Sequence, residues 1–539
     1  MKIRSRSVTS VVGVCLGLVG LLQGTPAWAA FGVVKNGANY SVDSGAGLLF
    51  WVDGANGDIT SIKLNGTELN SPVKRSHIGS GLGSATVTTA TYGTSTVKIT
   101  VSTSTLTHYY MVRNGQNTIY MATYISEQPT VGELRWITRL QTGTVPNSPA
   151  PSDLRGTTGA IESQDVFGLT NGQTRSKYYG NERAMDLAVR GVTGNGIGVW
   201  MNYGNRESAS GGPFFRDIQN QTGDQQEVYN YMNSGHNQTE PFRTGVLHGP
   251  YALIFTNGST PQSWIDTSWI YSQGLNLTGW VQHRGYVNGK ANGIPAGFQG
   301  VVAFSSATSQ GWCVVDPATG NFSGPWLKPG NYTMTLYKGE LAVASQPVTI
   351  PQSTVPVTKN ITSAEFVPAS SLWRIGEWDG TPAGFKNAAN IKWMHPSDSR
   401  QTPWGPTTFT IGSSAPGGFP SIQWKDVNNS TAIKFDVSSN QLAPLTLRVG
   451  ITGAYAGGRP QIKVNNWTSP APAASSQPNS RSFTIGTYRG NNATYTYNIP
   501  MSALVVGTNT LNLTVISGSS GTGFLSPSVA YDCIELSAS

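Results

Sequence analysis

Cysteine and charged residues are both scarce in this chain. Its 539 residues include 3 Cys, and Asp, Glu, Lys and Arg together make up 12%. Cys15 lies in an apolar N-terminal leader, and Cys313 and Cys533 fall in what we expect to be different domains, so a disulfide framework is excluded. Ordinary hydrophobic cores must therefore hold the chain together, and its length predicts several domains.

Long apolar runs are also missing, apart from one near the start of the chain. Lys2, Arg4 and Arg6 precede the apolar stretch Val11–Leu22, and Ala27–Ala29 has the small-x-small pattern of a cleavage site. These features predict a signal peptide over residues 1–29. The run is too short for a membrane span and no second one follows. We therefore expect a secreted, extracellular protein without a membrane anchor.

The formal charge is +8, and it falls to +5 without the three basic residues of the leader, which holds no acids. A basic surface suits a polyanionic partner, although many secreted proteins are basic without having one. Lys and Arg are dispersed, with no basic stripe or recognition helix, so we expect no nucleic acid partner.

The sequence has no amphipathic helix of useful length, and its patterns are those of strands. In Ser95–Val101 the residues Val97, Ile99 and Val101 alternate with polar ones, which is typical of a half-buried strand. Turn signals such as Asn65-Gly66 and Asn114-Gly115 recur at short intervals. We predict an all-β protein built from antiparallel sandwiches.

Shifts in composition predict three domains after the leader. The first covers residues 30–274 and the second covers residues 275–359, whose length suits a fibronectin-type sandwich. The last covers residues 360–539. Gln352–Thr358 has the composition of a linker before the third domain. No internal repeat is evident.

Two short segments concentrate residues that can transfer protons, Thr174–Arg183 and Tyr229–His236. A lysine amine, with an ordinary pKa of about 10.4, becomes a base when burial or nearby cations lower that pKa. Lys177 has Arg175 and Arg183 nearby in sequence, and His236 is of a type that titrates near neutrality. This set suits a metal-independent lyase acting on an acidic polysaccharide. A solvated lysine and a structural histidine would fit the same spacing.

Arg135 and Arg139 are four residues apart, so they would share one face of a strand. Two cations on one face could clamp a carboxylate, or they could pair with acids such as Glu133 or others on neighbouring strands. No metalloprotease, phosphate-loop or serine-hydrolase motif is present. The scattered acids of the first domain leave a glycosidase carboxylate pair open.

Many strings along the mature chain, in one order, resemble polysaccharide lyase family 4, the three-domain secreted rhamnogalacturonan lyases. They are Ala30–Gly32, Ser76–Thr88, Gly132–Arg135, Arg175–Lys177, Gly211–Pro213, Tyr231–His236, Leu247–Tyr251, Ile375–Gly380, His395–Arg400, Gly457–Pro460 and Tyr531–Cys533.

The resemblance implies a galactose-mutarotase-like β-sandwich, a fibronectin type III-like sandwich and a carbohydrate-binding-like jelly roll. It implies β-elimination at the rhamnose–galacturonate bond of the pectin polymer rhamnogalacturonan I, by a monomer that needs no cofactor for catalysis. A non-catalytic pectin-binding protein and a hydrolase with paired carboxylates are the alternatives.

The resemblance also implies roles for individual residues. Lys177 matches the proton abstractor and His236 the second catalytic residue. The positions expected to contact substrate are Arg135, Arg139, Tyr229, Tyr231 and Arg459, the last from the third domain. A structural calcium ion is expected by analogy, with Asp379 and Asp532 as ligands.

Overall fold

In this computed structural model, buried side chains alternate with more exposed ones along strands such as β8 (Thr96–Ser102). In β8, the side chains of Val97, Ile99 and Val101 are buried, which confirms the predicted half-buried strand. The structure describes residues 30–129, 132–238, 240–475 and 481–539. The predicted signal peptide, residues 1–29, lies outside the described residues.

The first domain contains four antiparallel sheets. Its five-stranded sheet consists of β1 (Gly32–Asn36), β2 (Asn39–Asp43), β3 (Leu48–Val52), β4 (Ile59–Leu64) and β5 (Thr67–Glu68). Its seven-stranded sheet has the order β15 (Val189–Gly194), β16 (Ile197–Asn202), β19 (Val246–Thr256), β10 (Thr118–Ile125), β9 (Leu106–Arg113), β8 and β7 (Thr86–Tyr92).

Two smaller sheets of the first domain carry the candidate catalytic residues. The four-stranded sheet has the order β17 (Asn220–Thr222), β18 (Gln225–Asn233), β11 (Leu134–Gln141) and β6 (His77–Ile78). The three-stranded sheet consists of β12 (Gly159–Glu162), β13 (Val166–Gly168) and β14 (Thr174–Ser176).

A large core lies between the seven-stranded sheet and the other sheets of the first domain. It joins Phe50 of β3, Tyr110 of β9 and Trp136 of β11, all almost fully buried. The other face of the seven-stranded sheet packs against the helix α1 (Ser268–Ser272) through Trp269 and Ile270. The inner face of β11 therefore belongs to the core, which leaves its outer face for a site.

The second domain is a smaller sandwich of two four-stranded sheets around its own core. One consists of β23 (Asn321–Ser323), β20 (Val287–Asn292), β26 (Val357–Thr358) and β27 (Ile361–Thr362). The other has the order β22 (Gln310–Val314), β21 (Gly300–Ser305), β24 (Gly330–Lys338) and β25 (Leu341–Ile350).

The third domain packs two five-stranded sheets face to face around a core. The first consists of β28 (Ser371–Gly376), β37 (Ser528–Ala538), β32 (Leu445–Tyr455) and β35 (Ala493–Ile499), with β30 (Ile422–Trp424) paired to β37. The second has the order β29 (Thr407–Thr410), β31 (Thr431–Val437), β36 (Gly507–Ile516), β33 (Arg459–Val464) and β34 (Trp467–Thr468).

Helices are short throughout the described residues. Besides α1, they are α2 (Ser482–Ile485) and the 3-10 turns Ala150–Ser152, Ala388–Asn390, Pro416–Gly418, Met501–Ala503 and Gly523–Leu525. None of the helices in the described ranges is long and apolar enough to cross a membrane. Cys313 and Cys533 are both free, as predicted. The predicted all-β sandwich architecture is confirmed.

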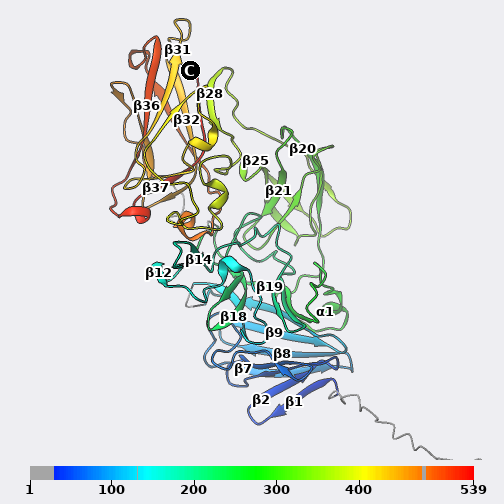
Figure 1. Ribbon diagram of the computed structural model, residues 1–539. Coiled ribbons are helices and arrows are strands. Elements are labelled where there is room, and N and C mark those ends of the chain that lie inside the picture. Colours follow the sequence, from blue (N-terminus) through cyan, green and yellow to red (C-terminus); the bar gives the residue numbers. More distant parts are fainter. Residues whose placement is uncertain (1–29, 130–131, 239, 476–480) are drawn as a thin grey trace, which may run out of the picture.

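The small sheet β12–β14 lies where the first and third domains meet (Figure 1). This sheet, in cyan, lies between the first domain and the third domain, while the second domain sits beside both. The segments that carry Lys177 and His236 therefore face a junction of domains, not open solvent alone.

Candidate active site

The site is built on the outer face of β11 and β18, which pair in antiparallel register. Arg135 lies opposite Tyr231, and Arg139 lies opposite Glu227. Trp136 between them points into the core and is fully buried. The period of two along a strand thus places both arginines on one face, as the sequence predicted.

Arg135 is held by four groups. Its Nη1 atom donates to the Glu133 carboxylate and to the Tyr231 hydroxyl, both at 2.7 Å, and its Nη2 atom donates to Ser80 Oγ at 2.9 Å. A longer bond reaches the Gly79 carbonyl oxygen at 3.4 Å. Burial lowers the pKa of the Arg135 guanidinium, but its interactions with Tyr231 and Glu133 raise the pKa by more. The net pKa is raised, so Arg135 stays charged.

Arg139 and Tyr229 form a second polar group on the same face. Arg139 Nε donates to Glu227 Oε1 at 2.9 Å, and the Tyr229 hydroxyl donates to Glu227 Oε2 at 2.5 Å. The rings of Tyr229 and Tyr231 stack with centroids 5.8 Å apart. Both arginines therefore pair with carboxylates, one of the two alternatives that the sequence left open.

Lys177 follows β14 directly and reaches a carboxylate. Its Nζ atom lies 3.1 Å from Asp165 Oδ1. The cations that we expected beside Lys177 lie elsewhere. Arg175 donates to the carbonyl oxygen of Asp153, and Arg183 pairs with Asp186. The partner of Lys177 in the described structure is thus an acid from the turn before β13.

A cation from the third domain completes this group. Arg481 Nη2 lies 2.8 Å from Asp165 Oδ2, and Arg481 Nη1 lies 2.6 Å from Glu162 Oε1. Glu162 is also bound by the buried His395 and by the hydroxyl of Thr484. Asp165 therefore bridges Lys177 of the first domain and Arg481 of the third.

His236 lies between two carboxylates. Its Nδ1 atom is 2.9 Å from Asp217 Oδ2, and its Nε2 atom is 3.3 Å from Glu133 Oε1. Burial lowers the pKa of His236 and Lys177 lowers it a little more, but Asp217 and Glu133 outweigh both, so the pKa is raised. The charged imidazolium form is favoured.

The ring of Tyr178 joins the two candidate catalytic residues. It packs edge-on against His236, with ring centroids 5.3 Å apart, and Lys177 Nζ lies 5.5 Å from its centroid. The ring of Tyr231 also contacts His236 at 5.7 Å. An amine, an imidazole and the guanidinium of Arg135 therefore meet on one aromatic-lined face.

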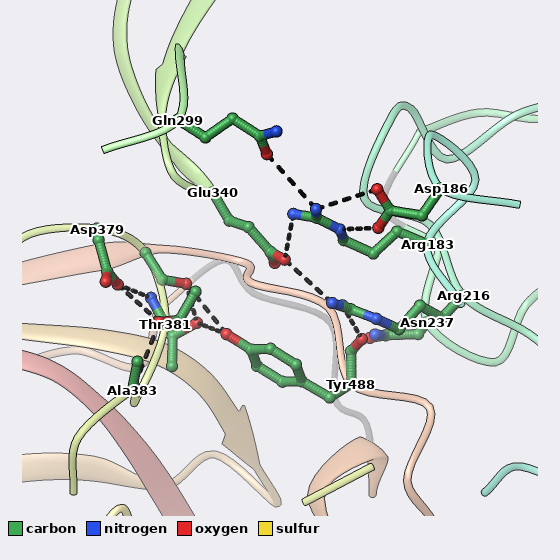
Figure 2. A network of polar contacts seen from close by, with 12 residues as sticks. Arg183, Asp186, Arg216, Asn237, Gln299, Glu340, Asp379, Thr381, Ala383 and Tyr488 are labelled. Carbon is green, nitrogen blue, oxygen red and sulfur yellow. Dashed lines mark hydrogen bonds and ion pairs between the residues drawn. The ribbon is translucent and has the colours of Figure 1, made fainter. Parts of the chain in front are cut away.

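Residues next to the catalytic groups are tied to the other two domains. Arg216, which precedes Asp217, pairs with Glu340 of the second domain at 3.1 Å and donates to the Tyr488 carbonyl oxygen of the third at 2.6 Å (Figure 2). Asn237, which follows His236, donates to the Thr487 carbonyl oxygen at 2.6 Å. The position of His236 therefore depends on all three domains.

Arg459, predicted to contact substrate from the third domain, has its described contacts inside that domain. Its Nε atom donates to the Pro472 carbonyl oxygen at 2.6 Å, and its Nη1 atom donates to the Gly457 carbonyl oxygen at 3.0 Å. In the described part of the chain, Arg481 is the third-domain arginine that reaches the Lys177 side of the site.

Asp379 and Asp532, the predicted calcium ligands, are neighbours in the third domain. Asp532 Oδ1 accepts the backbone N–H groups of Asp379, Gly380 and Thr381, the shortest at 2.8 Å. Burial, and then the charges of Glu340 and Glu377, raise the pKa of Asp379. Burial, and then the charge of Asp379, raise the pKa of Asp532. A cation would relieve this repulsion. No group of three or more His, Cys, Asp or Glu side chains suited to a metal occurs within the described ranges.

The sequence did not predict the roles of four acidic residues and one arginine of this site. They are Glu133 as a partner of His236, together with Glu162, Asp165, Asp217 and Arg481. A lone Asp or Glu in a loop carries no periodic signal. Only the proximity of Asp165 to Lys177 in sequence could have suggested one of these pairs.

Three sandwich domains around a cluster of cations, tyrosines and an imidazole define a multidomain enzyme acting on acidic polysaccharide. Comparison with known proteins agrees with this class. Residues 31–279 match the family model "Rhamnogalacturonan lyase B, N-terminal", and residues 283–360 and 371–536 match "Polysaccharide lyase family 4", domains II and III.

Relatives that match nearly the whole chain support the same family. The chain is 47% identical over 513 residues to a rhamnogalacturonate lyase A of Emericella nidulans, covering 94% of this chain and 96% of that protein. It is 46% identical over 517 residues to a rhamnogalacturonate lyase A of Aspergillus aculeatus, covering 95% of this chain and 97% of that protein. The chain belongs to polysaccharide lyase family 4.

Proposed function

We propose that this protein is a rhamnogalacturonan lyase, which cleaves the bond between rhamnose and galacturonate in rhamnogalacturonan I by β-elimination. The observation that carries the proposal is the meeting of Lys177, His236 and Arg135 around the rings of Tyr178 and Tyr231. The identity to rhamnogalacturonate lyases along nearly the whole chain supports the same reaction.

The chemistry needs three groups. A base removes the hydrogen on C5 of galacturonate, the electron pair forms the C4–C5 double bond, and the C4–O4 bond breaks as the leaving oxygen takes a proton. Negative charge builds on the sugar carboxylate while the C5–H bond breaks. Arg135, fixed by Glu133, Ser80 and Tyr231, can stabilise that charge. One such donor lowers a barrier by about 3 kcal/mol.

In this proposal Lys177 accepts the C5 proton and His236 donates a proton to the leaving oxygen. The contact with Asp165 fixes the direction of the Lys177 Nζ atom, which accepts the C5 proton in its neutral amine form after giving up its own proton to Asp165 or to solvent. The raised pKa of His236 supports its role as donor, because the imidazolium then persists at neutral pH. Arg139, Tyr229 and Tyr231 would line the substrate path along β11 and β18.

The experiment follows the ultraviolet absorbance of the conjugated double bond when the protein is incubated with rhamnogalacturonan I. We expect a rise with the wild-type protein and none with Lys177→Ala, which should still bind oligosaccharide. Saturated products without the absorbance rise would indicate a hydrolase with paired carboxylates. Binding without any product would indicate a pectin-binding protein.

We also propose that the elimination needs no metal ion, and that the protein acts as a secreted monomer on pectin. Support for secretion is the leader pattern in residues 1–29. A structural calcium ion at Asp379 and Asp532 is a separate proposal. Its support is the pair of neighbouring carboxyls with raised pKa values, and calcium would draw its remaining oxygen ligands from elsewhere.

A further inference from the structure

A cleft with a volume of about 290 Å³ lies between the first and second domains, and neither Lys177 nor His236 lines it. Its first-domain wall includes Asn205, Arg206 and Glu207, and its second-domain wall includes Trp312 and Trp326. A second cleft of about 300 Å³ shares Asn205 and Glu207 with the first and continues past Trp280 and Tyr271. The two hollows together form a path along the domain junction.

Aromatic rings line this path. Trp326 is 51% exposed, and its ring lies 4.4 Å from that of Tyr286 at a tilt of 52°. Tyr271 is 53% exposed in the neighbouring cleft. Single exposed aromatic residues are common, but apolar surface gathered along a cleft is typical of a ligand-binding site. Their flat apolar faces suit the C–H faces of sugar rings.

Positive charge in the walls of the path and directly behind them exceeds negative charge. Arg284 forms a two-pronged ion pair with Glu207, and Lys328 Nζ lies 3.7 Å from the same carboxylate. Arg206 pairs with no carboxylate in the described residues, and its Nε and Nη2 atoms have no hydrogen-bond partner there. Arg284 and Lys328 thus share one acid, and Arg206 adds a third positive charge beside them.

The pKa values reflect this imbalance. Burial lowers the pKa of Arg206 to about 10, and the charge of Tyr203 offsets only part of the effect. Burial also lowers the pKa of Lys328. Glu207 raises this pKa, whereas Arg284 and Arg243 lower it, and the net pKa is lowered. A nearby anion would stabilise all of these cations.

We propose that this cleft is a second binding site for a uronate-bearing segment of the polysaccharide, held by Trp312 and Trp326 and by the excess positive charge of the Arg206–Glu207–Arg284 wall. The identity of the polymer rests on the proposed function. The volume of each hollow, near the lower end of ligand pockets at roughly 300 Å³, suits a short segment of chain. A polymer bound both here and at the Lys177–His236 site would stay attached between cleavage events.

The experiment measures binding without turnover, using the Lys177→Ala protein and rhamnogalacturonan I oligosaccharides of increasing length in calorimetric titrations. We expect two binding events per chain, and one event after the further change Trp326→Ala, or a second event weakened by roughly tenfold. The matched control is Phe366→Ala, which removes an aromatic side chain that is 61% exposed in the segment before β28. It should leave both events intact.

Two further arms test the ligand class and the function separately. The second event should weaken with added salt and should be absent with neutral galactan oligosaccharides. In the otherwise wild-type protein, Trp326→Ala should raise KM for the polymer and leave kcat for short oligosaccharides unchanged. A single binding event in Lys177→Ala, or equal effects of Trp326→Ala and Phe366→Ala, would overturn the proposal. A wild-type protein without the absorbance rise would instead overturn the proposed function.

Discussion

Lys177 of the first domain and Arg481 of the third bind the two oxygen atoms of one carboxylate, that of Asp165, at 3.1 Å and 2.8 Å. The third domain is therefore part of the catalytic unit, and not only an attached binding module. Its segment from Arg481 to Arg489 also contacts the His236 side, where Arg489 pairs with Glu240. Both candidate catalytic residues thus depend on the docking of one domain.

Arg481→Ala should lower kcat/KM by roughly 10²-fold, because a misplacement of about 1 Å can cost that much. The variant removes the Arg481 ion pairs with Asp165 and Glu162. Asp165 can then move, and Lys177, which contacts it, moves as well. The absorbance assay gives kcat and KM, and Arg481→Lys should restore part of the rate. Arg374→Ala, which removes an exposed third-domain arginine paired with Glu377, is the control and should be unchanged. Equal rates for both alanine variants would contradict the role of Arg481.

The pH dependence should report His236. Since its pKa is raised, the donating imidazolium is complete at low pH and is lost as pH rises through that raised value. The basic limb of kcat should therefore lie above the ordinary histidine pKa of about 6.5. Asp217→Asn removes the strongest anionic partner, so the limb should move to lower pH. Asp186→Asn, which alters the Arg183 pair, should leave the limb in place. A basic limb unaffected by Asp217→Asn would exclude His236 as the donor.

Arg135→Lys should cost about 2.7–4 kcal/mol of transition-state stabilisation, the range for one lost charge-stabilising donor. Lysine keeps the charge but cannot reach Glu133, Ser80 and Tyr231 together, as the planar guanidinium does. The loss should fall on kcat, measured by the absorbance assay under saturating substrate. Arg113→Lys, on the far face of the seven-stranded sheet beside Trp269, is the control. A rise in KM alone would mean that Arg135 only binds substrate.

The local structure could be predicted from the sequence because it depends on neighbours in the chain. The two-residue period of side chains along a strand predicted β8 and the common face of Arg135 and Arg139. The Asn-Gly signals lie in turns, such as Asn114-Gly115 between β9 and β10. These features follow from backbone geometry within a few residues.

The partners within the site could not be predicted, because tertiary contacts decide them. Arg481 and Asp165 are 316 positions apart in the chain. Arg459 and Arg481 both belong to the third domain, and nothing in a single sequence says which of them reaches the first domain. Arg175 is two residues from Lys177, yet its side chain binds the Asp153 carbonyl oxygen instead. Proximity in sequence did not predict proximity of charge.

Trp136→Ala should destabilise the first domain by about 3–5 kcal/mol, the usual cost of truncating a large buried aromatic residue. Trp136 is fully buried, stacks on His108 at 5.4 Å, and donates from Nε1 to Thr138 at 2.8 Å. Denaturant unfolding followed by fluorescence measures the change. Trp264→Ala, at a site that is 66% exposed, should stay within about 0.5 kcal/mol of wild type. A small effect of Trp136→Ala would mean that β11 is not anchored by the core.

Calcium should act on the stability of the third domain and not on the elimination itself. If Ca²⁺ binds at Asp379 and Asp532, it offsets the burial and the charge repulsion that raise their pKa values, so the melting temperature should rise with Ca²⁺ and fall with a chelator. Mg²⁺ should have little effect, because it demands a tighter octahedral site. Asp379→Asn should abolish the shift, while the absorbance assay in chelator should give the wild-type rate. A rate that fell with chelator while the melting temperature stayed constant would contradict both proposals, since the metal would then belong to the catalytic groove.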